Sequence, residues 1–400
     1  MNKDLTTGSV FKSIIYFSLP YLLSYFLQTL YGMADLFIIG QFNGVESTTA
    51  VSIGSQVMHM LTVMIVGLAM GSTVIIGRAA GAKETKQANL AIGNTVIMFM
   101  FLSIICMALL LLAVKPFIYI MSTPEEAVPG TTSYLIICFI GIPFITAYNI
   151  ISSIFRGMGD SKSPMYFIAV ACIFNIVLDY IFIGISRLGT AGAALGTTLS
   201  QTISVIISLI VIKKRKMITN ICLTDFKPKK EMLGSILKIG IPVAAQDGFI
   251  QIAFIIITIF ANRRGLNDAA AVGIVEKLIG ILFLVPSSML SAVSALSAQN
   301  IGAKKHDRAG QILKYATAIT VLFGLIISAI MQFTAENAVS LFTGNNEVIT
   351  LGGQYMRSYV WDCIFAGVHF CFSGYFCAYG LSIISFIHNS LSIICARIPL

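Results

Sequence analysis

Charged side chains are scarce in this chain. They make up 11% of its 400 residues, whereas 57% are hydrophobic and the mean hydropathy is +0.89. Soluble domains carry roughly 25% charged residues. Long polar segments are missing as well, because the longest connector between apolar runs covers only residues 213–233. These absences exclude a soluble globular protein and leave no room for a separate soluble domain, so we expect an integral membrane protein.

Sequence signatures of common enzymes and metal sites are also missing. The chain has no Gly-Lys dipeptide, which excludes a P-loop for nucleotide phosphates, and no HExxH motif. Its eight cysteines stand singly, mostly in apolar runs, and its four histidines are dispersed. We expect neither disulfides nor a metal nor a cofactor. A membrane-embedded transferase would need acids and histidines clustered near one interface. The sequence has no such cluster, so we do not expect an enzyme.

The chain is rich in long apolar runs. A helix needs about 20 mostly apolar residues to cross a bilayer. Eleven runs reach this length, at residues 13–39, 50–75, 90–114, 132–154, 165–185, 191–212, 234–260, 270–296, 311–333, 354–376 and 381–400. The first run continues to Ile39 without a cleavage site of small residues, so we expect it to stay in the membrane. The predicted fold class is all-α integral membrane, with eleven visible spans.

Basic residues lie mostly on one side of the predicted membrane. The net charge is +9, and most of the 26 Lys and Arg fall in connectors on the side of the N-terminus. Because such residues favour the cytoplasmic side, we expect a plasma-membrane protein with a cytoplasmic N-terminus. A basic cluster at 213–216 and 227–230 would then face the inner leaflet. We assign this cluster to topology and contact with anionic membrane lipid, and not to nucleic acid.

The two halves of the chain match each other at an offset of 221 residues. At this offset Gly81-Ala82-Lys83 meets Gly302-Ala303-Lys304, and Gly159 meets Gly380. The first repeat holds six spans, an even number, so both repeats share one orientation across the membrane. We predict an N-terminal six-helix lobe at residues 1–216, a cytoplasmic linker at 217–233 and a C-terminal lobe at 234–400.

This parallel repeat indicates transport. Two matched bundles with a cleft between them suit alternating access, in which the cleft opens to each side of the membrane in turn. A duplication can also merely enlarge a bundle, but a chain without a soluble domain favours a transporter. By the offset, the second repeat would run past Leu400. We therefore expect the C-terminal lobe to be incomplete, with the twelfth span absent.

Two acidic residues interrupt apolar runs of the first repeat. Asp35 lies in the first run and Asp179 in the fifth, although a charge at the bilayer centre costs at least about 2.5–3.5 kcal/mol. Each acid has a polar residue four positions earlier, Tyr31 and Asn175 respectively, which places the pair on one helical face. We interpret the acids as a candidate cation or proton site. The alternative is that each acid reaches water near a helix end.

The second repeat carries a different set of polar residues. Asp247 and Gln251 lie in the seventh run, and Glu276 and Lys277 lie in the eighth. Adjacent residues on a helix point about 100° apart, so Glu276 and Lys277 need not pair. Asp362 lies toward the outer end of the tenth run. For the first four residues, helix packing and a functional role remain equal alternatives, and for Asp362 contact with water is the equal alternative.

Several motifs in order resemble a known transporter family. They are Ile15-Tyr-Phe-Ser-Leu-Pro20, Tyr31 to Gly40, Gly81-Ala-Lys, Phe155-Arg-Gly-Met-Gly-Asp160 and Gln299-Asn-Ile-Gly302. With the six-span repeat, they resemble the multidrug and toxic compound extrusion (MATE) family, and within it the DinF-like branch. The resemblance implies twelve spans in two six-helix lobes. It also implies export of small organic, chiefly cationic, compounds by antiport with protons or sodium ions, carried out by a monomer.

The resemblance also implies where the coupling cation binds. In the DinF-like branch the site lies in the N-terminal lobe, and by motif it would use Asp35, Asp179, Asn175, Tyr31, Thr197 and Asn149. Pro20 would bend the first span. The NorM-like branch carries an acid on span seven where this chain has Gln251, which argues against a sodium site in the C-terminal lobe. In the second repeat, Cys377 stands where the first repeat has Arg156.

Two further functions remain open at the level of sequence. A lipid-linked oligosaccharide flippase of the same superfamily would need a large cationic cavity for pyrophosphate, and the apolar runs hold few Arg or Lys. A truncated remnant that inserts but does not transport would carry the same motifs. Efflux of small organic molecules is the function that we expect.

Overall fold

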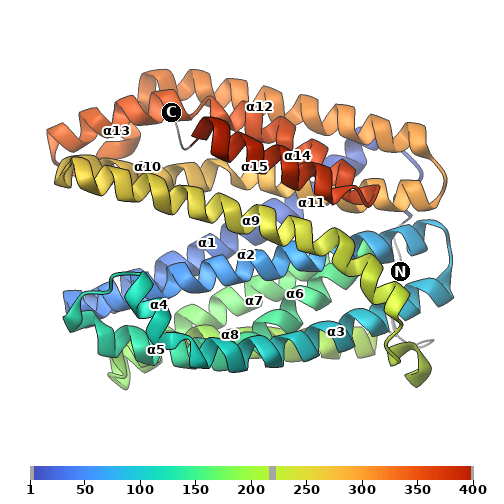
Figure 1. The fold of residues 1–400 in the computed structure, drawn as a ribbon, viewed down its shortest axis with the longest axis horizontal. Coiled ribbons are helices and arrows are strands. Elements are labelled where there is room, and N and C mark those ends of the chain that lie inside the picture. Colours follow the sequence, from blue (N-terminus) through green and yellow to red (C-terminus); the bar gives the residue numbers. More distant parts are fainter. Residues whose placement is uncertain (1–3, 216–221, 398–400) are drawn as a thin grey trace.

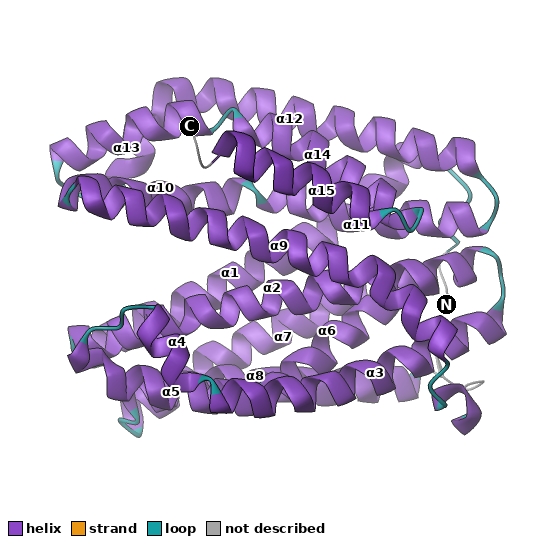
Figure 2. Ribbon diagram, viewed as in Figure 1, coloured by secondary structure: helices purple, strands orange, loops and turns teal. Residues whose placement is uncertain are grey.

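The computed structural model describes residues 4–215 and 222–397, and every regular element within these ranges is helical (Figure 2). The first half comprises α1 (Val10–Phe42), α2 (Val45–Gly81), α3 (Thr85–Leu112), α4 (Val114–Ile120), α5 (Val128–Ile140), α6 (Ile142–Gly157), α7 (Lys162–Asp179), a π-helical turn η2 (Tyr180–Ile185) and α8 (Gly189–Lys214). The second comprises α9 (Lys230–Arg264), α10 (Leu266–Leu282), α11 (Leu284–Gly302), α12 (His306–Ser340), α13 (Asn346–Tyr359), α14 (Asp362–Ala378) and α15 (Ser382–Ser392). Short single turns are η1 (Glu125–Ala127), η3 (Leu223–Phe226) and η4 (Ile393–Arg397).

The helices form two halves that lie side by side, with most helix axes along the long dimension of the molecule (Figure 1). We call α1–α8 the N-terminal half and α9–α15 the C-terminal half. Helix α2 packs along α9 and α11, and α1 packs against α7 of its own half and α11 of the other. The contact between the halves is therefore made chiefly by α1, α2, α9 and α11.

The predicted apolar runs coincide with helices. Eight helices among the described residues are long and apolar enough to cross a membrane. Two further pairs, α5 with α6 and α13 with α14, pass the same test together and are bent by 48° and 42°. The eleventh run contains a shorter apolar helix, Ser382–Cys395. The prediction of an all-helical membrane protein is confirmed, with up to ten spans by length and composition.

Glycine and proline lie at the break between α5 and α6, whereas the proline of α1 does not break that helix. The bend between α5 and α6 falls at Gly141, and Pro143 follows it at the start of α6, where a missing N–H costs nothing. Helix α1, in contrast, runs as one element through Pro20. Ser24 donates a hydrogen bond to the Pro20 carbonyl, with a distance of 2.7 Å between the oxygens, so a side chain supports the helix one turn beyond the proline.

The sequence offset of 221 recurs in the backbone. Lys83 and Lys304 both have positive φ angles, +58° and +59°, and so do Gly159 and Gly380, at +89° and +71°. These residues follow the ends of α2 and α11 and of α6 and α14, respectively. A positive φ is uncommon for lysine, so its occurrence at two equivalent positions indicates that the two halves end their helices in the same way.

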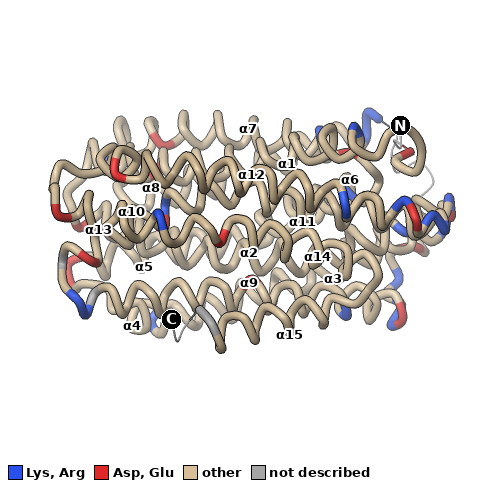
Figure 3. Tube along the Cα trace, turned by 90° about the horizontal axis from the view of Figure 1, so that it is seen from above, with Lys and Arg blue, Asp and Glu red and all other residues tan. Residues whose placement is uncertain are grey.

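Charged residues gather at the two ends of the molecule, and most Lys and Arg lie at the end that carries the N-terminus (Figure 3). The middle of the molecule is largely free of charge in this view. Large apolar side chains such as Leu19, Phe101 and Leu322 are at least 60% exposed along the sides of the helices. An apolar belt between two charged ends is the surface that a bilayer requires.

Candidate cation site and the contact between the halves

Two buried carboxyl groups meet inside the N-terminal half. Asp35 on α1 is 3% exposed and Asp179, the last residue of α7, is 0% exposed. Their side chains lie within hydrogen-bonding reach of each other. Thr197 on α8 donates from Oγ1 to Asp35 Oδ2 over 3.0 Å. Helix α1 and the much later helices α7 and α8 therefore hold one acid pair together.

The surroundings of the pair leave hydrogen-bonding capacity unused. Asn175, one turn before Asp179, lies next to Asp35, yet neither polar atom of its amide makes a well-formed hydrogen bond within the described residues. The same is true of Asp35 Oδ1 and of both carboxylate oxygens of Asp179. Buried polar atoms without partners are rare and costly. A shared proton or a small cation would satisfy these oxygens, because two bare carboxylates repel each other.

Tyr31 and Thr197 join the acids as the motifs predict. Tyr31 is half-buried, lies near Asp35, and has its hydroxyl within reach of Gln201 on α8. The structure thus brings together Asp35, Asp179, Asn175, Tyr31 and Thr197. Asp35 and Asp179 are both almost completely buried, so neither carboxyl group reaches solvent in the structure.

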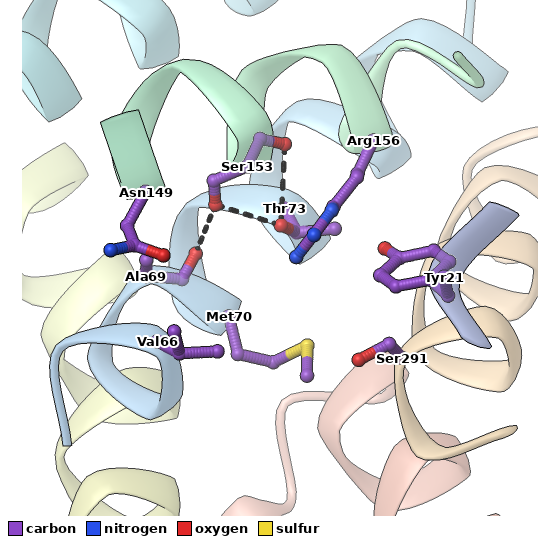
Figure 4. A pocket seen from close by; sticks show the side chains of 9 residues that line it. All are labelled: Tyr21, Val66, Ala69, Met70, Thr73, Asn149, Ser153, Arg156 and Ser291. Atoms are coloured by element: carbon purple, nitrogen blue, oxygen red, sulfur yellow. Dashed lines mark hydrogen bonds between the residues drawn. The ribbon is translucent and has the colours of Figure 1, made fainter. Parts of the chain in front are cut away.

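Asn149 lies in a different place from the acids. Its Nδ2 donates to the Ile145 carbonyl over 2.8 Å, and its side chain lines a separate cavity of about 10 Å³ (Figure 4). That cavity lies between α1, α2, α6 and α11 and is lined by Tyr21, Val66, Ala69, Met70, Thr73, Asn149, Ser153, Arg156 and Ser291. The Arg156 guanidinium carbon lies 4.3 Å from the centre of the Tyr21 ring. No hydrogen bond within the described residues joins Asn149 to Asp35 or Asp179.

Two residues of α8 next to the acids are not among the site residues that the sequence predicts. A Cβ placed on Gly196 would lie only 2.0 Å from Asp179 Oδ1, so a larger residue cannot stand there without displacing the carboxylate. Gln201 is 5% exposed, and its Oε1 has no partner within the described residues. Gln201 could have been predicted from the sequence, because it follows Thr197 by four positions and therefore lies on the same helical face.

Within the described part of the C-terminal half, neither Asp247 nor Glu276 lies against a second acid. Glu276 accepts a hydrogen bond from Thr258 Oγ1 over 3.1 Å, and Lys277 is exposed. Asp247 faces α2, where its Oδ2 lies 2.8 Å from the Cβ that Gly67 lacks. Among the described residues there is no group of three or more His, Cys, Asp or Glu that could hold a metal ion.

A histidine pair in the C-terminal half was not expected from the sequence. The Nδ1 atoms of His369 on α14 and His388 on α15 lie 3.2 Å apart, and the rings are stacked with centres 5.1 Å apart. Nε2 of His369 lies 3.5 Å from Nε2 of Gln246 on α9. The two histidines stand on different helices, so no helical spacing could have brought them together.

The two halves are closed against each other at the end that carries the N-terminus. Arg78 at the end of α2 donates from Nε to the Ala378 carbonyl over 2.8 Å, and Gln299 on α11 donates from Nε2 to the Gly157 carbonyl over 2.8 Å. Closer to the middle, the hydroxyls of Tyr25 and Ser291 lie 3.0 Å apart. We call the Arg78–Ala378 and Gln299–Gly157 contacts the interhalf clasp.

Comparison with known proteins identifies the family. The family model described as MatE matches residues 20–181 and 242–400. Probable multidrug resistance protein YpnP of Bacillus subtilis is 30% identical over 396 residues, which cover 99% of this chain and 88% of the relative. YoeA, a probable multidrug resistance protein of the same organism, is 27% identical and covers 90% of this chain and 79% of its own length. Multidrug export protein MepA of Staphylococcus aureus is 25% identical, with coverages of 91% and 81%.

Solved structures share the fold. An outward-facing multidrug resistance MATE family transporter of the MOP superfamily superposes with a TM-score of 0.91 at 24% identity, covering 99% of this chain and 88% of its own. A MOP superfamily transporter from Pyrococcus furiosus, described as having a binding pocket of reverse polarity, gives 0.89 at 23% identity, with coverages of 99% and 91%. Together, the sequence match, the fold and the helical spans lead to one conclusion: this chain belongs to the MatE family, whose members are membrane transporters and not enzymes.

Proposed function

We propose that the protein exports small organic, chiefly cationic, molecules from the cell by antiport with protons, and that Asp35 and Asp179 form the coupling site. The observation that carries this proposal is the meeting of two almost completely buried acids from α1 and α7. The names of the relatives YpnP, YoeA and MepA, all tied to multidrug resistance or export, support the substrate class.

The acid pair gives a physical basis for coupling. With one proton shared between Asp35 and Asp179, the carboxyl groups attract each other and hold α1 against α7. Loss of that proton leaves two like charges in a buried space. Two unit charges about 4 Å apart repel by roughly 4 kcal/mol at an effective dielectric constant of about 20. This repulsion favours a conformation in which α1 and α7 separate or in which a cation enters, so proton binding biases one of two states.

The neighbours of the pair have supporting roles in this mechanism. Thr197 donates to Asp35 and orients its carboxylate, leaving Oδ1 free for the shared proton. Asn175 and Tyr31 extend the polar surface on either side. The Asp35–Asp179 contact favours a proton over sodium, because a hydrogen bond between two carboxyl groups requires a proton. Sodium would instead have to draw several of the unpartnered oxygens of Asp35, Asp179 and Asn175 around one point.

Alternating access would be carried by the contact between the halves. The interhalf clasp joins the ends of α2 and α11 to the carbonyls that close α14 and α6. Opening of the clasp would expose the surfaces between α1, α2, α9 and α11 to the cytoplasm. We place the N-terminus and the clasp on the cytoplasmic side of the plasma membrane, because most Lys and Arg lie at that end (Figure 3).

The finer classification follows from the same residues. The acid pair in the N-terminal half, together with Gln251 on α9, supports the DinF-like branch. The shorter apolar helix Ser382–Cys395 would belong to an eleventh span, and the halves would act as lobes of the MATE fold. The flippase alternative is not favoured, since the cavity of about 10 Å³ beside Arg156 is far too small for a lipid pyrophosphate.

Efflux by cells tests this function. Bacteria that lack their own multidrug exporters and express the chain should extrude ethidium, and Asp35→Asn or Asp179→Asn should each abolish the extrusion. Asp307→Asn, which changes an exposed acid at the start of α12, should leave it intact. Membrane insertion of every variant is checked by its yield in the membrane fraction. Wild-type ethidium extrusion by either acid variant would remove that acid from the mechanism.

A further inference from the structure

A groove of about 370 Å³ runs along the outer surface of α1. It is lined by Phe11, Lys12, Ile15, Tyr16, Leu19, Pro20 and Lys162. All of these belong to α1 except Lys162, the first residue of α7. The walls are almost wholly apolar. Because Lys12 and Leu19 are seven residues apart, the groove extends about 10 Å along the helix axis.

The groove lies where the two halves meet at the side of the molecule. Helix α1 contacts α7 of its own half and α12 of the other, and α1 lies between them in the view of Figure 3. Phe11, at one end of the groove, makes an edge contact with Tyr315 on α12, with ring centres 6.3 Å apart. A molecule in this groove would therefore lie beside the seam between the halves.

Two ammonium groups flank one end of the groove. Lys12 and Lys162 are exposed, and neither makes an ion pair among the described residues. The nearby Asp160 carboxylate is already engaged, because it accepts from Arg215 over 3.1 Å and from Ser163 over 2.6 Å. The Lys162 ammonium lies 4.4 Å from the centre of the Tyr16 ring, which holds it over the groove by a cation–π contact.

This combination of an apolar channel and two cations at one end matches one kind of ligand. Water would gain little from the apolar walls of this groove. A free phosphate ion would use the lysines and leave the channel empty. A phospholipid would fill both, with its acyl chain along Ile15 and Leu19 and its phosphate between the lysines.

We propose that this groove binds one anionic phospholipid, with the headgroup phosphate at Lys12 and Lys162 and an acyl chain packed along α1 as far as Pro20. The lysines lie at the end of the molecule that the proposed topology places at the cytoplasmic leaflet, where anionic lipids face inward. The binding itself does not depend on that topology, nor on whether the chain transports.

Binding is measured on the purified full chain in the uncharged detergent dodecyl maltoside. Native mass spectrometry counts bound lipid, and the unfolding temperature reports stabilisation, on titration with dioleoylphosphatidylglycerol, with the matching phosphatidylcholine, and with glycerol phosphate, which has no chains. One molecule of dioleoylphosphatidylglycerol should bind to each protein molecule and raise its unfolding temperature. Phosphatidylcholine should bind much more weakly, and glycerol phosphate should have no effect.

Matched variants separate the headgroup from the chain. Lys12→Gln with Lys162→Gln should weaken phosphatidylglycerol binding about 30-fold, on the basis of roughly 1 kcal/mol per lysine. Lys83→Gln with Lys86→Gln removes the same charge from exposed residues at the junction of α2 with α3, outside the groove, and should leave binding nearly unchanged. Leu19→Trp should fill the groove and block the chain, whereas Leu322→Trp, with the same 60% exposure on α12, should not.

Three results would overturn the proposal. One is equal loss of binding in the two lysine double variants, and another is equal binding in the two tryptophan variants. The third is equal stabilisation by phosphatidylcholine or by glycerol phosphate, which would mean that chain or charge alone is recognised. Lys12, Lys162 and Leu19 are all exposed, so unfolding temperatures without lipid should match the wild type. If one variant folds poorly, the comparison that does not include it still tests whether the groove binds the lipid.

Discussion

Arg78 and Gln299 stand at equivalent positions of the internal repeat, and each donates a hydrogen bond to the last carbonyl of a helix in the opposite half. The accepting residues, Ala378 and Gly157, are equivalent to each other as well. The clasp therefore consists of two equivalent hydrogen bonds, one donated by an arginine of the N-terminal half and the other by a glutamine of the C-terminal half. The same repeat brings Gly81 against the Gln299 carbonyl and Gly302 against the Arg78 carbonyl. Two glycines thus allow the two helix ends to approach closely.

The first prediction concerns these glycines. A Cβ on Gly81 would lie 1.9 Å from the Gln299 carbonyl oxygen, and one on Gly302 would lie 2.0 Å from that of Arg78. Because backbone oxygens cannot turn aside, Gly81→Ala and Gly302→Ala should each destabilise the closed clasp by about 1–3 kcal/mol. Cys377, which is 1% exposed beside the clasp, should then react faster with a small maleimide in a background without other cysteines.

The matched control for this prediction is Gly310→Ala on α12. Nothing lies within 4 Å of the Cβ that this change adds, so Cys377 should react as in the wild type. A helical glycine replaced by alanine should even gain up to about 1 kcal/mol of stability. Equal maleimide rates in Gly81→Ala, Gly302→Ala and Gly310→Ala would mean that the clasp does not govern closure.

The second prediction tests the packing of α8 against the acid pair. Gly196→Ala should push the Asp179 carboxylate away, because the new Cβ would lie 2.0 Å from Oδ1. Coupled transport should fall at least about tenfold, since small misplacements of reacting groups have large effects. Gly273→Ala, whose Cβ meets nothing within 4 Å, serves as the control in the same ethidium assay. Full activity of Gly196→Ala would show that the exact position of Asp179 is unimportant.

The third prediction is a pH dependence outside the membrane spans. The hydroxyl and backbone N–H of Thr6 hold the pKa of Asp4 below its ordinary value, with hydrogen bonds of 2.6 and 2.9 Å. A carboxyl group whose pKa is lower in the folded state than in the unfolded state stabilises the fold at pH values above its unfolded pKa. This stabilisation is lost as the pH falls through the folded pKa. The free energy of unfolding should therefore fall slightly as pH drops below about 4, by less than about 0.5 kcal/mol because Asp4 is exposed, and the unfolding temperature should fall with it.

Thr6→Val removes the hydroxyl and should reduce this acid sensitivity. The measurement is the unfolding temperature of both forms between pH 3 and pH 6, with the difference between them largest at the upper end of the range. An identical pH profile for the two forms would contradict the assignment of the pKa shift to Thr6.

The fourth prediction fixes the orientation in the membrane. Cys222, an exposed native cysteine in the connector before η3, should face the cytoplasm. A cysteine introduced by Glu126→Cys, in the exposed turn η1, should face outward. In single-cysteine chains expressed in intact cells, an impermeant maleimide should label position 126 and spare position 222. Labelling of position 222 alone would reverse the proposed topology.

The spans could be predicted from the sequence because a helix that crosses the bilayer needs about 20 mostly apolar residues in contact with lipid. The helix caps, the bends and the extra length of α2 and α12 could not be predicted from the sequence, because they depend on neighbouring helices. The eight long helices and the two bent pairs coincide with the first ten apolar runs. The repeat was visible for the same reason, since its matches fall at helix ends such as Gly81 and Gly302, where close approach requires glycine.

The candidate site could be predicted only in part. Helical spacing correctly joined Tyr31 to Asp35 and Asn175 to Asp179, because four residues make about one turn. The meeting of Asp35 with Asp179 is a tertiary contact, and only the family resemblance pointed to it. Gln201 and Gly196 were missed because their role depends on how α8 packs against α7. Asn149 belongs to another cavity because its face of α6 turns toward α2, which no pattern within α6 reveals.

The central claim is that Asp35 and Asp179 together bind the proton that drives export. The most direct test is proton movement in sealed vesicles that contain only the purified chain and a pH dye. Addition of ethidium to wild-type vesicles with an imposed pH gradient should release protons in a fixed ratio to the ethidium transported, and the ratio should not change with sodium. Asp35→Asn and Asp179→Asn should release none, while Asp307→Asn should match the wild type. Ethidium-driven proton release that persists in either acid variant would contradict the account.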